Sequence, residues 1–356
     1  MVMNLRNSLN NKSIGVIGIG SFGTVIANIL AEKNEVIVYA RNPEVVEEIN
    51  QRHMVEGKKL HLRIKATDDP EYICDRCDIL FPMISSSGFT EVMRKFSPFL
   101  HPYHLLIHGT KGLCLDLPPG KSLEDVQQIN RENIYTMSEV IQNETVVVRI
   151  GCLAGPNLAK ELEVGQPAAT VIASRYDEVI LEGQRLLRND NFQVYGNKDI
   201  IGVELSGVLK NIIAIAAGAL AGMGLGENAK GLLISRGMVE MIHLGKALGG
   251  STNSFIGLAG VGDLVTTCSS TFSRNYTVGY KLAQGENLEL IKQGMEETAE
   301  GINTVRLVKL FIEGKDLRAP ITETLYRVLF EGYKVELALQ YLMKIPLNVD
   351  VDFLED

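Results

Sequence analysis

A glycine-rich turn near the start of the chain limits the possible folds more than any other feature. Residues 18–23 read Gly-Ile-Gly-Ser-Phe-Gly, between an apolar run, Ser13–Ile19, and a segment with apolar residues at helical spacing, Phe22–Ala31. In such a turn the first glycine permits the tight bend, the second lets the backbone approach a pyrophosphate, and the third lets helix and strand pack closely. The order strand, turn, helix therefore predicts a phosphate-binding turn at a helix N-terminus.

Strand and helix patterns alternate through the first half of the chain. Glu35–Ala40 is typical of a second buried strand, and Pro43–Asn50 of a second helix with proline in its first turn. The further strand candidates are Asp78–Met83, Leu105–His108, Val146–Leu153 and Ala169–Ala173. Alternation of this kind predicts an α/β fold with a mostly parallel sheet covered on both faces. We assign residues 1–198 to a Rossmann-type dinucleotide-binding domain.

The pattern changes after about Gly196. Asp199–Leu225 and Asn228–Leu248 are long segments rich in Ala, Gly and Leu. Shorter helical candidates follow at Thr304–Ile312, Thr322–Phe330 and Val335–Leu342. We therefore expect an all-helical C-terminal domain over residues 199–356. Within the first half, Leu113–Thr145 is rich in polar residues and is interpreted as an irregular excursion of unassigned role.

Charge and hydropathy exclude several classes of protein. The 356 residues include 35 Lys and Arg against 43 Asp and Glu, a formal charge of −8, whereas a general nucleic-acid binder is expected to be basic. The longest apolar run, Ile212–Leu225, is shorter than the roughly 20 residues that span a bilayer. The first 13 residues lack the apolar core of a signal peptide. We expect a cytoplasmic protein without a membrane span.

The cysteines and histidines predict no metal site. Cys74 and Cys77 form a single CxxC pair, and the other three of the five cysteines are scattered along the chain. His104 and His108 are four residues apart beside a predicted strand, with no further ligand close in sequence. Reduced thiols in a cytosolic protein are the simplest interpretation.

The end of the second predicted strand bears on which nicotinamide cofactor is used. A carboxylate at this place would bind the ribose 2′-hydroxyl of NAD, but the sequence reads Val38-Tyr39-Ala40-Arg41. Arg41 is placed to meet a 2′-phosphate, which favours NADP. Because a solvated arginine at a strand end has the same pattern, use of NAD stays open.

Two features of the second half could carry chemistry. Lys210 lies within the apolar helical stretch Gly207–Ile213, where desolvation favours general acid–base use, although from spacing alone a lysine that reaches to the surface is the better interpretation. Ser273-Arg274-Asn275 offers an arginine fork between hydroxyl and amide groups, a good grip for phosphate. A capped helix start with a surface arginine is the alternative interpretation.

Together, these motifs make the chain resemble the NAD(P)-dependent glycerol-3-phosphate dehydrogenases, particularly the bacterial type. The similarity runs from about Ser13 to at least Leu342. The matching segments are, in order, Gly18–Thr24, Thr110–Gly112, Leu153–Glu161, Gly202–Asn211, Gly226–Lys230, Arg236–Gly237, Gly257–Leu264 and Ser273–Asn275.

The resemblance implies a role for each matching residue. Lys210 is expected to be the catalytic proton donor and acceptor, and Ser273 and Arg274 to hold the substrate phosphate. The residues expected to contact the substrate are Lys111, Gly155, Asn157, Lys210, Asp263, Ser273, Arg274 and Asn275. The residues expected to contact NADP(H) or NAD(H) are Gly18, Gly20, Ser21, Phe22, Gly23, Arg41, Lys111, Ala159, Arg274 and Glu300.

The implied reaction is the reversible reduction of dihydroxyacetone phosphate to sn-glycerol 3-phosphate, which supplies glycerophospholipid synthesis. The family also implies a homodimer. One alternative is another two-domain dehydrogenase acting on a β-hydroxyacid or ketopantoate, and a second is a non-catalytic NAD(P)H-sensing protein. The fold alone does not choose between these functions.

The sequence departs from the family pattern at three places. Ser85-Ser86-Ser87 stands where Pro-Ser-Gln is usual after the strand that ends near Met83. Asn157 replaces the Ser or Thr of many bacterial members, and the stretch between Lys111 and Gly155 is longer than usual. These differences bear on the cofactor-side loop and on the excursion, but they remove no group required for catalysis.

Overall fold

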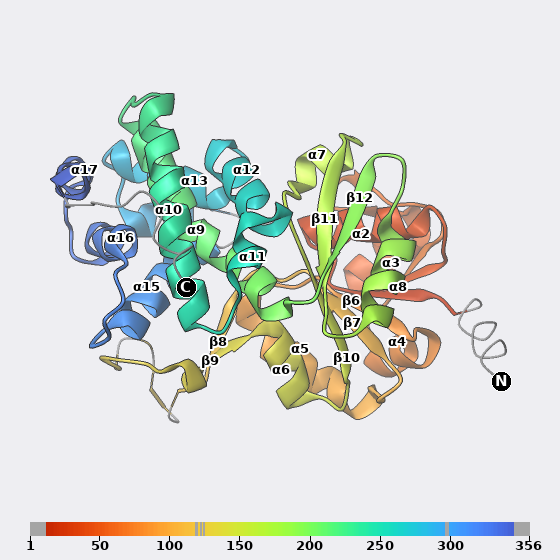
Figure 1. Cartoon of the computed structure of the whole chain (residues 1–356). Coiled ribbons are helices and arrows are strands. Elements are labelled where there is room, and N and C mark those ends of the chain that lie inside the picture. The colour runs from red at the N-terminus through yellow and green to blue at the C-terminus, as the bar shows by residue number, and fades with distance from the viewer. Residues whose placement is uncertain (1–11, 118–119, 122, 124, 296–298, 345–356) are drawn as a thin grey trace. The chain divides into compact units, whose positions relative to one another are not determined.

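The computed structural model describes residues 12–117, 120–121, 123, 125–295 and 299–344 (Figure 1). These residues form two compact units. The first takes in the described residues up to Cys114 together with Met137–Ile200, and the second takes in those of Leu115–Thr136 and those from Ile201 onward. Most of the first 13 residues, from which no signal peptide was predicted, lie outside the described part of the chain.

A sheet of eight described strands forms the centre of the first unit. In sequence order the strands are β1 Ile14–Ile17, β2 Val36–Tyr39, β5 Ile64–Thr67, β6 Ile79–Pro82, β7 Leu105–His108, β10 Arg149–Ala154, β11 Ala168–Ala173 and β12 Phe192–Asn197. Their order in the sheet is β12-β11-β10-β7-β6-β1-β2-β5, and all pairs are parallel except β10 with β11. A short hairpin, β3 Met54–Val55 with β4 Lys58–Lys59, lies outside this sheet.

Helices cover both faces of the sheet, as the α/β pattern predicted (Figure 1). They are α2 Ser21–Ala31, α3 Pro43–Arg52, α4 Pro70–Arg76, α5 Phe89–Phe96, α6 Met137–Glu144, α7 Ala159–Glu163 and α8 Asp177–Leu187. Helix α2 contacts α7 and α8, whereas α5 contacts α4 and α6. Because all four residues of each of β1, β2, β6 and β7 are buried, these strands appear in the sequence as continuous apolar runs.

Strand β1 marks the point where the sheet changes its direction of growth. It pairs with β2 on one side and with β6 on the other. Strand β5 lies beyond β2, whereas β7 and the later strands of the sheet lie beyond β6. In open α/β sheets, ligands bind at the carboxyl ends of the strands beside such a switch point. The glycine-rich turn follows β1 at this place.

The second unit is largely helical, as predicted. Its helices are α9 Ile200–Gly222, α10 Glu227–Ala247, α11 Thr252–Ile256, α12 Asp263–Ser269, α13 Arg274–Ala283, α14 Leu288–Gln293, α15 Glu300–Ile312, α16 Pro320–Phe330 and α17 Val335–Lys344. A π-helical turn, η4 Leu258–Gly262, leads directly into α12.

Helix α9 is the central helix of this unit, and glycines allow its neighbours to approach closely. A Cβ at Gly218 would lie 1.9 Å from the Tyr276 carbonyl oxygen of α13, and one at Gly279 would lie 1.7 Å from the Ile215 carbonyl oxygen of α9. The two backbones are therefore in direct contact, which any larger residue would prevent. On another side of α9, Gly237 of α10 packs against an isoleucine side chain.

Helix α9 is also the one described helix that is long and apolar enough to cross a membrane. Its 18-residue window has a mean hydropathy of 1.7, but 94% of that window is buried inside the structure. The helix begins well before the apolar run Ile212–Leu225, so the length of that run alone did not exclude a span. Burial of this degree is what a core helix shows, and one such helix is weak support for a membrane protein.

The excursion predicted as irregular contains regular elements and divides between the two units. Strand β8 Leu113–Leu115 pairs with β9 Ile134–Thr136, and α6 begins directly after β9. The described residues of 115–136 belong with the helical unit and α6 with the sheet. The prediction of a wholly irregular segment was therefore wrong, because short strands with half-polar sequences carry little periodicity.

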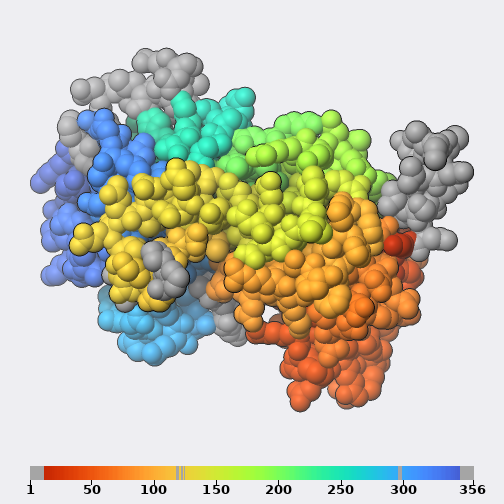
Figure 2. All heavy atoms as spheres, turned by 90° about the horizontal axis from the view of Figure 1, so that it is seen from below, coloured from red at the N-terminus to blue at the C-terminus, as the bar shows by residue number. Residues whose placement is uncertain are grey.

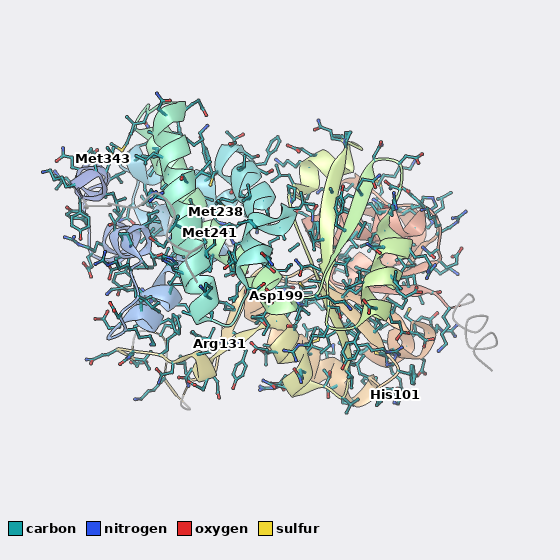
Figure 3. The ribbon with its side chains drawn as sticks, viewed as in Figure 1. His101, Arg131, Asp199, Met238, Met241 and Met343 are labelled. Atoms are coloured by element: carbon teal, nitrogen blue, oxygen red, sulfur yellow. The ribbon has the colours of Figure 1, made fainter. Side chains whose placement is uncertain are left out.

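Two cations fasten this segment to the helical unit. Arg131, labelled in Figure 3, donates from Nε to the Leu248 carbonyl oxygen just after α10, at 2.7 Å. Lys315 donates from Nζ to the carbonyl oxygens of Ile129 and Phe311. Both cations therefore satisfy carbonyl groups at helix ends, where the helix dipole favours positive charge. In Figure 2 the segment is yellow and lies beside the blue residues of the later helices.

A buried carboxylate links α10 to α16. Glu240 is 4% exposed and accepts hydrogen bonds from the backbone nitrogens of Ile321 and Thr322 and from the Thr322 hydroxyl. These contacts cap the N-terminus of α16. Burial raises the pKa of the Glu240 carboxyl to about 7, although the three hydrogen bonds act in the opposite direction.

Candidate functional site

The three glycines of the turn between β1 and α2 have the three different surroundings that their predicted roles require. Gly18 has a φ of +103°, and a Cβ there would lie 2.7 Å from the Met83 carbonyl oxygen. A Cβ at Gly23 would lie 2.3 Å from the Gly18 carbonyl oxygen. At Gly20 the same atom would meet no described residue within 4 Å. The first and third glycines are thus required by packing, whereas the second leaves the backbone open to a ligand.

The same turn fits a dinucleotide electrostatically. Gly20 is the N-cap of α2 and has no side-chain cap, so Ser21 and Phe22 begin the helix with backbone N–H groups at its positive end. An anion such as a pyrophosphate is stabilised at this position. The residues present therefore fit the dinucleotide that the sequence predicted.

Loops after β6 and β7 meet the turn at the carboxyl edge of the sheet. A Cβ at Gly109, directly after β7, would lie 2.9 Å from the Phe22 ring, so ring and backbone are in contact. The Thr110 hydroxyl donates to the Ile84 carbonyl oxygen at 2.7 Å. Gly109 and Thr110 lie beside predicted site residues, but neither was predicted as a contact. The matching segment Thr110–Gly112 was the signal that could have drawn attention to them.

Lys111 and Gly155, both predicted to contact substrate, lie together in the first unit. Lys111 Nζ donates to the Gly155 carbonyl oxygen at 3.2 Å, which joins the loop after β7 to the loop after β10. Gly155 has a φ of +149°, and a Cβ there would lie 3.2 Å from the Ala169 carbonyl oxygen. The position therefore favours glycine for backbone reasons as well as for any ligand.

Asn157 holds its own loop together. Its side-chain amide lies 2.8 Å from the Thr170 hydroxyl. When the amide oxygen accepts from this hydroxyl, the amide nitrogen donates to the carbonyl oxygens of Pro156 and Ala169, both at 3.2 Å. The departure from Ser or Thr at this position thus introduces a group with several partners inside the protein.

The remaining predicted cofactor residues of the first unit are Arg41 and Ala159. Arg41 is exposed and lies two residues after the end of β2. In the sheet, β2 and β7 lie on opposite sides of β1. Ala159 begins α7, which packs against α2. The structure therefore keeps Arg41 on the β2 side of the switch point, where the adenosine end of a dinucleotide is expected.

In the second unit, Lys210 is buried in a polar cluster. The residue is 5% exposed, and its Nζ lies 2.6 Å from Asp263 Oδ1 and 2.5 Å from Thr267 Oγ1. Asp263 and Thr267 are 2% and 4% exposed. The alternative in which this lysine reaches the surface is therefore wrong. We call Lys210, Asp263 and Thr267 the lysine cluster.

Thr267 fixes the geometry of the lysine cluster and was not predicted from the sequence. Its hydroxyl lies 2.6 Å from the Asp263 carbonyl oxygen and 3.2 Å from Asp263 Oδ1. Residues four apart share one face of a helix, so the four-residue spacing from Asp263 could have indicated that Thr267 lies in the site. The neighbouring Cys268 is also buried; burial raises the pKa of its thiol to about 12, with Lys210 acting in the opposite direction. The thiol is therefore protonated at neutral pH.

The Ser273-Arg274-Asn275 motif stands at the start of α13. Ser273 is the N-cap, and its Oγ accepts from the Tyr276 backbone nitrogen at 3.3 Å. Arg274 is the exposed first residue of the helix. The local structure is therefore the capped helix start with a surface arginine that was the alternative interpretation. An arginine in this position is accessible to solvent and to a ligand.

Asn275 joins α13 to the start of α15. Its Oδ1 accepts from the Gly301 backbone nitrogen at 2.9 Å, next to the predicted cofactor residue Glu300, which begins α15. A Cβ at Gly301 would lie 2.9 Å from the carbonyl oxygen of Asn211, the residue after Lys210. The structure thus brings two of the matching segments, Gly202–Asn211 and Ser273–Asn275, next to the helix start that carries Glu300.

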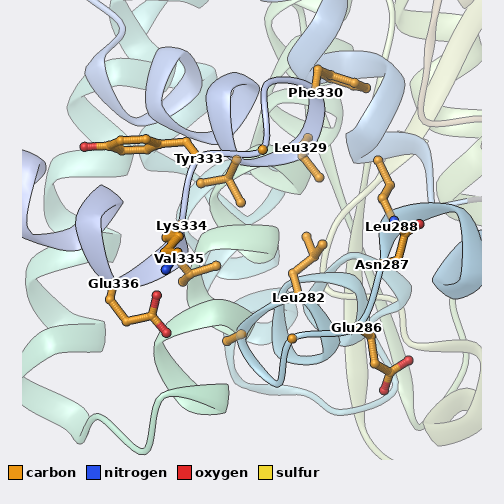
Figure 4. Close-up of a pocket in the computed structure, with 14 residues that line it drawn as sticks. Leu282, Glu286, Asn287, Leu288, Leu329, Phe330, Tyr333, Lys334, Val335 and Glu336 are labelled. Carbon is orange, nitrogen blue, oxygen red and sulfur yellow. The ribbon is translucent and has the colours of Figure 1, made fainter.

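Other features of the described residues do not enlarge the site. No group of three or more His, Cys, Asp or Glu residues within the described ranges is arranged to hold a metal ion. Figure 4 shows a pocket of about 430 Å³ in the helical unit, between the turn after α13 and the turn after α16. None of the predicted site residues lines this pocket.

A sheet with a glycine turn at its switch point, together with a helical unit that holds a buried lysine cluster, is the combination expected of a nicotinamide-dependent dehydrogenase. Sequence comparisons agree with this class. Residues 13–180 match the model of the NAD-dependent glycerol-3-phosphate dehydrogenase N-terminus, and residues 199–340 match that of the C-terminus. The chain therefore belongs to the NAD-dependent glycerol-3-phosphate dehydrogenase family.

Individual relatives match over nearly the whole chain. A glycerol-3-phosphate dehydrogenase [NAD(P)+] of Pseudomonas paraeruginosa is 38% identical over 96% of this chain and 97% of its own. That of Staphylococcus epidermidis is 38% identical over 94% and 98%. The crystal structure of glycerol-3-phosphate dehydrogenase from Coxiella burnetii has a TM-score of 0.81 at 30% identity and covers 94% of this chain and 99% of that one.

Proposed function

We propose that this protein catalyses the reversible, NAD(P)H-dependent reduction of dihydroxyacetone phosphate to sn-glycerol 3-phosphate. The fold is shared by the β-hydroxyacid, ketopantoate and sensor alternatives, so it does not discriminate among them. Family membership supports this reaction over those alternatives. The observation that carries the proposal is the buried contact of Lys210 with Asp263 at 2.6 Å, which provides a desolvated proton donor.

Lys210 is the group that we propose to move the proton. A bound reduced nicotinamide supplies a hydride to carbon 2 of the ketone. Lys210 Nζ donates a proton to the carbon-2 oxygen, which becomes the hydroxyl, and it takes the proton back in the reverse reaction. Asp263 and Thr267 both contact Nζ, so they hold its position during the transfer. A proton donor fixed in this way loses little entropy on reaching the reacting oxygen.

We assign substrate contacts in both units. Lys111 supplies positive charge to the substrate, which stabilises the developing oxyanion. Ser273 and Arg274 bind the phosphate, because a guanidinium makes paired hydrogen bonds to phosphate oxygens. The further substrate contacts that we propose are Gly155, Asn157, Asp263 and Asn275.

The cofactor contacts follow the carboxyl edge of the sheet. Gly18, Gly20 and Gly23 shape the turn, and the backbone N–H groups of Ser21 and Phe22 lie at the positive end of α2. Arg41 is the group that we propose to bind the 2′-phosphate of NADP(H). The other cofactor contacts that we propose are Lys111, Ala159, Arg274 and Glu300. We propose that residues 1–198 are the cofactor domain and residues 199–356 the substrate domain, with the described residues of 115–136 grouped with the latter.

We further propose a cytoplasmic homodimer that supplies glycerol 3-phosphate for glycerophospholipid synthesis. The family supports this cellular role because the product is the phosphorylated glycerol backbone itself. Light scattering of the purified protein tests the dimer: the expected mass is twice that of the 39.1 kDa chain. A mass of one chain at micromolar concentration would contradict it.

Comparison of substrates tests the proposed function. Purified protein with NADPH or NADH is given dihydroxyacetone phosphate, phosphate-free dihydroxyacetone or ketopantoate, and product is identified by mass spectrometry. We expect sn-glycerol 3-phosphate from the first substrate and at least 100-fold slower turnover of the others, since buried or paired phosphate contacts are worth several kcal/mol. Faster turnover of ketopantoate, or cofactor binding without turnover, would contradict the proposal.

A further inference from the structure

A second hydrogen bond joins the elements that carry Lys210 and Asp263, one helical turn earlier in each. Ser206 lies four residues before Lys210 on α9, and Ala259 lies four residues before Asp263. The Ser206 side chain is fully buried, and its hydroxyl lies 3.1 Å from the Ala259 carbonyl oxygen and 2.9 Å from that of Val203. Because residues four apart share a helix face, the two pairs form successive links between α9 and the segment leading into α12.

The segment that Ser206 contacts has an unusual backbone. Ala259 lies in the π-helical turn η4, which runs directly into Asp263, the first residue of α12. A π turn is rare because it widens the helix, and turns of this kind are frequent at functional sites. Its path is tight as well, since a Cβ at Gly260 would lie 1.8 Å from the Phe255 carbonyl oxygen. A turn of this shape depends on its surroundings to hold it.

We propose that Ser206 is a positioning residue: its hydrogen bond to the Ala259 carbonyl oxygen fixes the π turn and thereby sets the Asp263 carboxylate against Lys210 Nζ. This inference rests on the proposed function, in which Lys210 transfers the proton. Ser206 exchanges no proton itself. Without its hydroxyl, the turn relaxes and the carboxylate moves away from the ammonium group, so the buried charge loses part of its compensation.

A change of Ser206 to alanine separates positioning from simple stability. We expect Ser206→Ala to lower kcat roughly three- to tenfold, which is the range of one buried hydrogen bond, with KM for the cofactor unchanged. The upper limb of the kcat–pH profile should move to lower pH, since an ammonium with a weaker partner gives up its proton sooner. The titratable groups nearby include Asp263 and Cys268, and Lys230 of α10 acts on the Cys268 thiol. Burial raises the pKa of this thiol to about 12, above the range of the assay, although Lys210 and Lys230 act in the opposite direction.

A measurement without turnover distinguishes failure of this inference from failure of the proposed function. Protein labelled with ¹³C at lysine Cε is titrated by NMR, and the Lys210 signal is assigned by its loss in Lys210→Met. In Ser206→Ala this signal should move at a lower pH than in the wild type, whatever substrate the enzyme uses. If the wild type fails to reduce dihydroxyacetone phosphate but the signal moves as expected, only the proposed function fails.

Three further variants control the experiment. Ser174→Ala removes a comparable buried bond, from Ser174 Oγ to the Ile150 carbonyl oxygen at 2.6 Å in the first unit, and should leave kcat and the pH profile unchanged. Ser206→Cys keeps the shape with a weaker donor, so its kcat should fall between those of serine and alanine, and it carries the test if the alanine variant does not fold. In the Asp263→Asn background, Ser206→Ala should have little additional effect.

Two results would overturn the inference. The first is a folded Ser206→Ala, or in its place a folded Ser206→Cys, with the kcat and pH profile of the wild type. The second is full additivity of the Ser206 and Asp263 changes, which would mean that Ser206 does not act through the carboxylate.

Discussion

Lys210 Nζ and Asp263 Oδ1 lie 2.6 Å apart inside the helical unit, although the two residues are separated by 53 positions in sequence. Both side chains are almost completely buried. An ion pair in such a place stabilises the fold only as long as both partners are present, because either charge alone is costly to bury.

The first prediction is therefore that replacing both partners of the buried pair lowers the stability of the fold less than replacing either partner alone. Lys210→Met and Asp263→Leu should each lower the free energy of unfolding by about 3–5 kcal/mol, because each leaves one buried charge without its partner. The double variant should be more stable than either single one. Urea unfolding of the four proteins measures this, and additive losses in the double variant would argue against the pairing.

The glycines of the turn give a second prediction. Gly20→Ala should fold with wild-type stability but bind cofactor at least tenfold more weakly, because its Cβ meets no described residue and points into space that a ligand needs. Gly23→Ala should lower the melting temperature, because its Cβ would lie 2.3 Å from the Gly18 carbonyl oxygen. Fluorescence titration and thermal unfolding separate the two effects, and equal behaviour of the two variants would contradict the assignment.

Arg41 gives a third prediction, on cofactor choice. Arg41→Ala should raise KM for NADPH about tenfold and leave KM for NADH within twofold, because a charge-assisted hydrogen bond to phosphate is worth roughly 1.5–3 kcal/mol. The loss with NADPH should shrink at high salt, where the wild type also binds more weakly. Equal effects on both cofactors would show that Arg41 does not bind the 2′-phosphate.

Glu240 gives a fourth prediction, on pH and stability. Its carboxyl has a pKa of about 7 in the folded chain against 4.5 ordinarily, so between these values the folded state holds a proton that the unfolded state has lost. The free energy of unfolding should therefore fall as pH rises through this window, and the contribution is fully present only below it. Glu240→Gln should lack this component. Urea unfolding at several pH values tests it, and identical pH dependence in both proteins would rule it out.

Much of the fold could be predicted because its central strands are buried on both faces. β1 appears as an apolar run beside glycines and β2 as an apolar run between polar residues, and the structure confirms both. The strands at the two edges of the sheet, Ile64–Thr67 and Phe192–Asn197, were not predicted. Each includes residues that are only partly buried, so their sequences carry polar side chains and resemble loops.

The site was less accessible to sequence reasoning than the fold. Motifs named Lys210 and Asp263, but spacing could not decide whether the lysine is buried, because its partners come from a distant helix. Thr267 carries no motif of its own, and its role appears only when α12 is placed beside α9. Ser206 likewise depends on a contact with a carbonyl group, which no pattern of side chains reveals.

The role of Lys210 in the proposed reaction is tested most directly by the rate at which the protein consumes NADPH or NADH in the presence of dihydroxyacetone phosphate, followed by near-ultraviolet absorbance. We expect steady turnover by the wild type and a loss of at least 1,000-fold in kcat in a folded Lys210→Met that still binds cofactor, because the general acid is removed. A wild type that binds cofactor without turnover, or a Lys210→Met with undiminished kcat, would contradict this role.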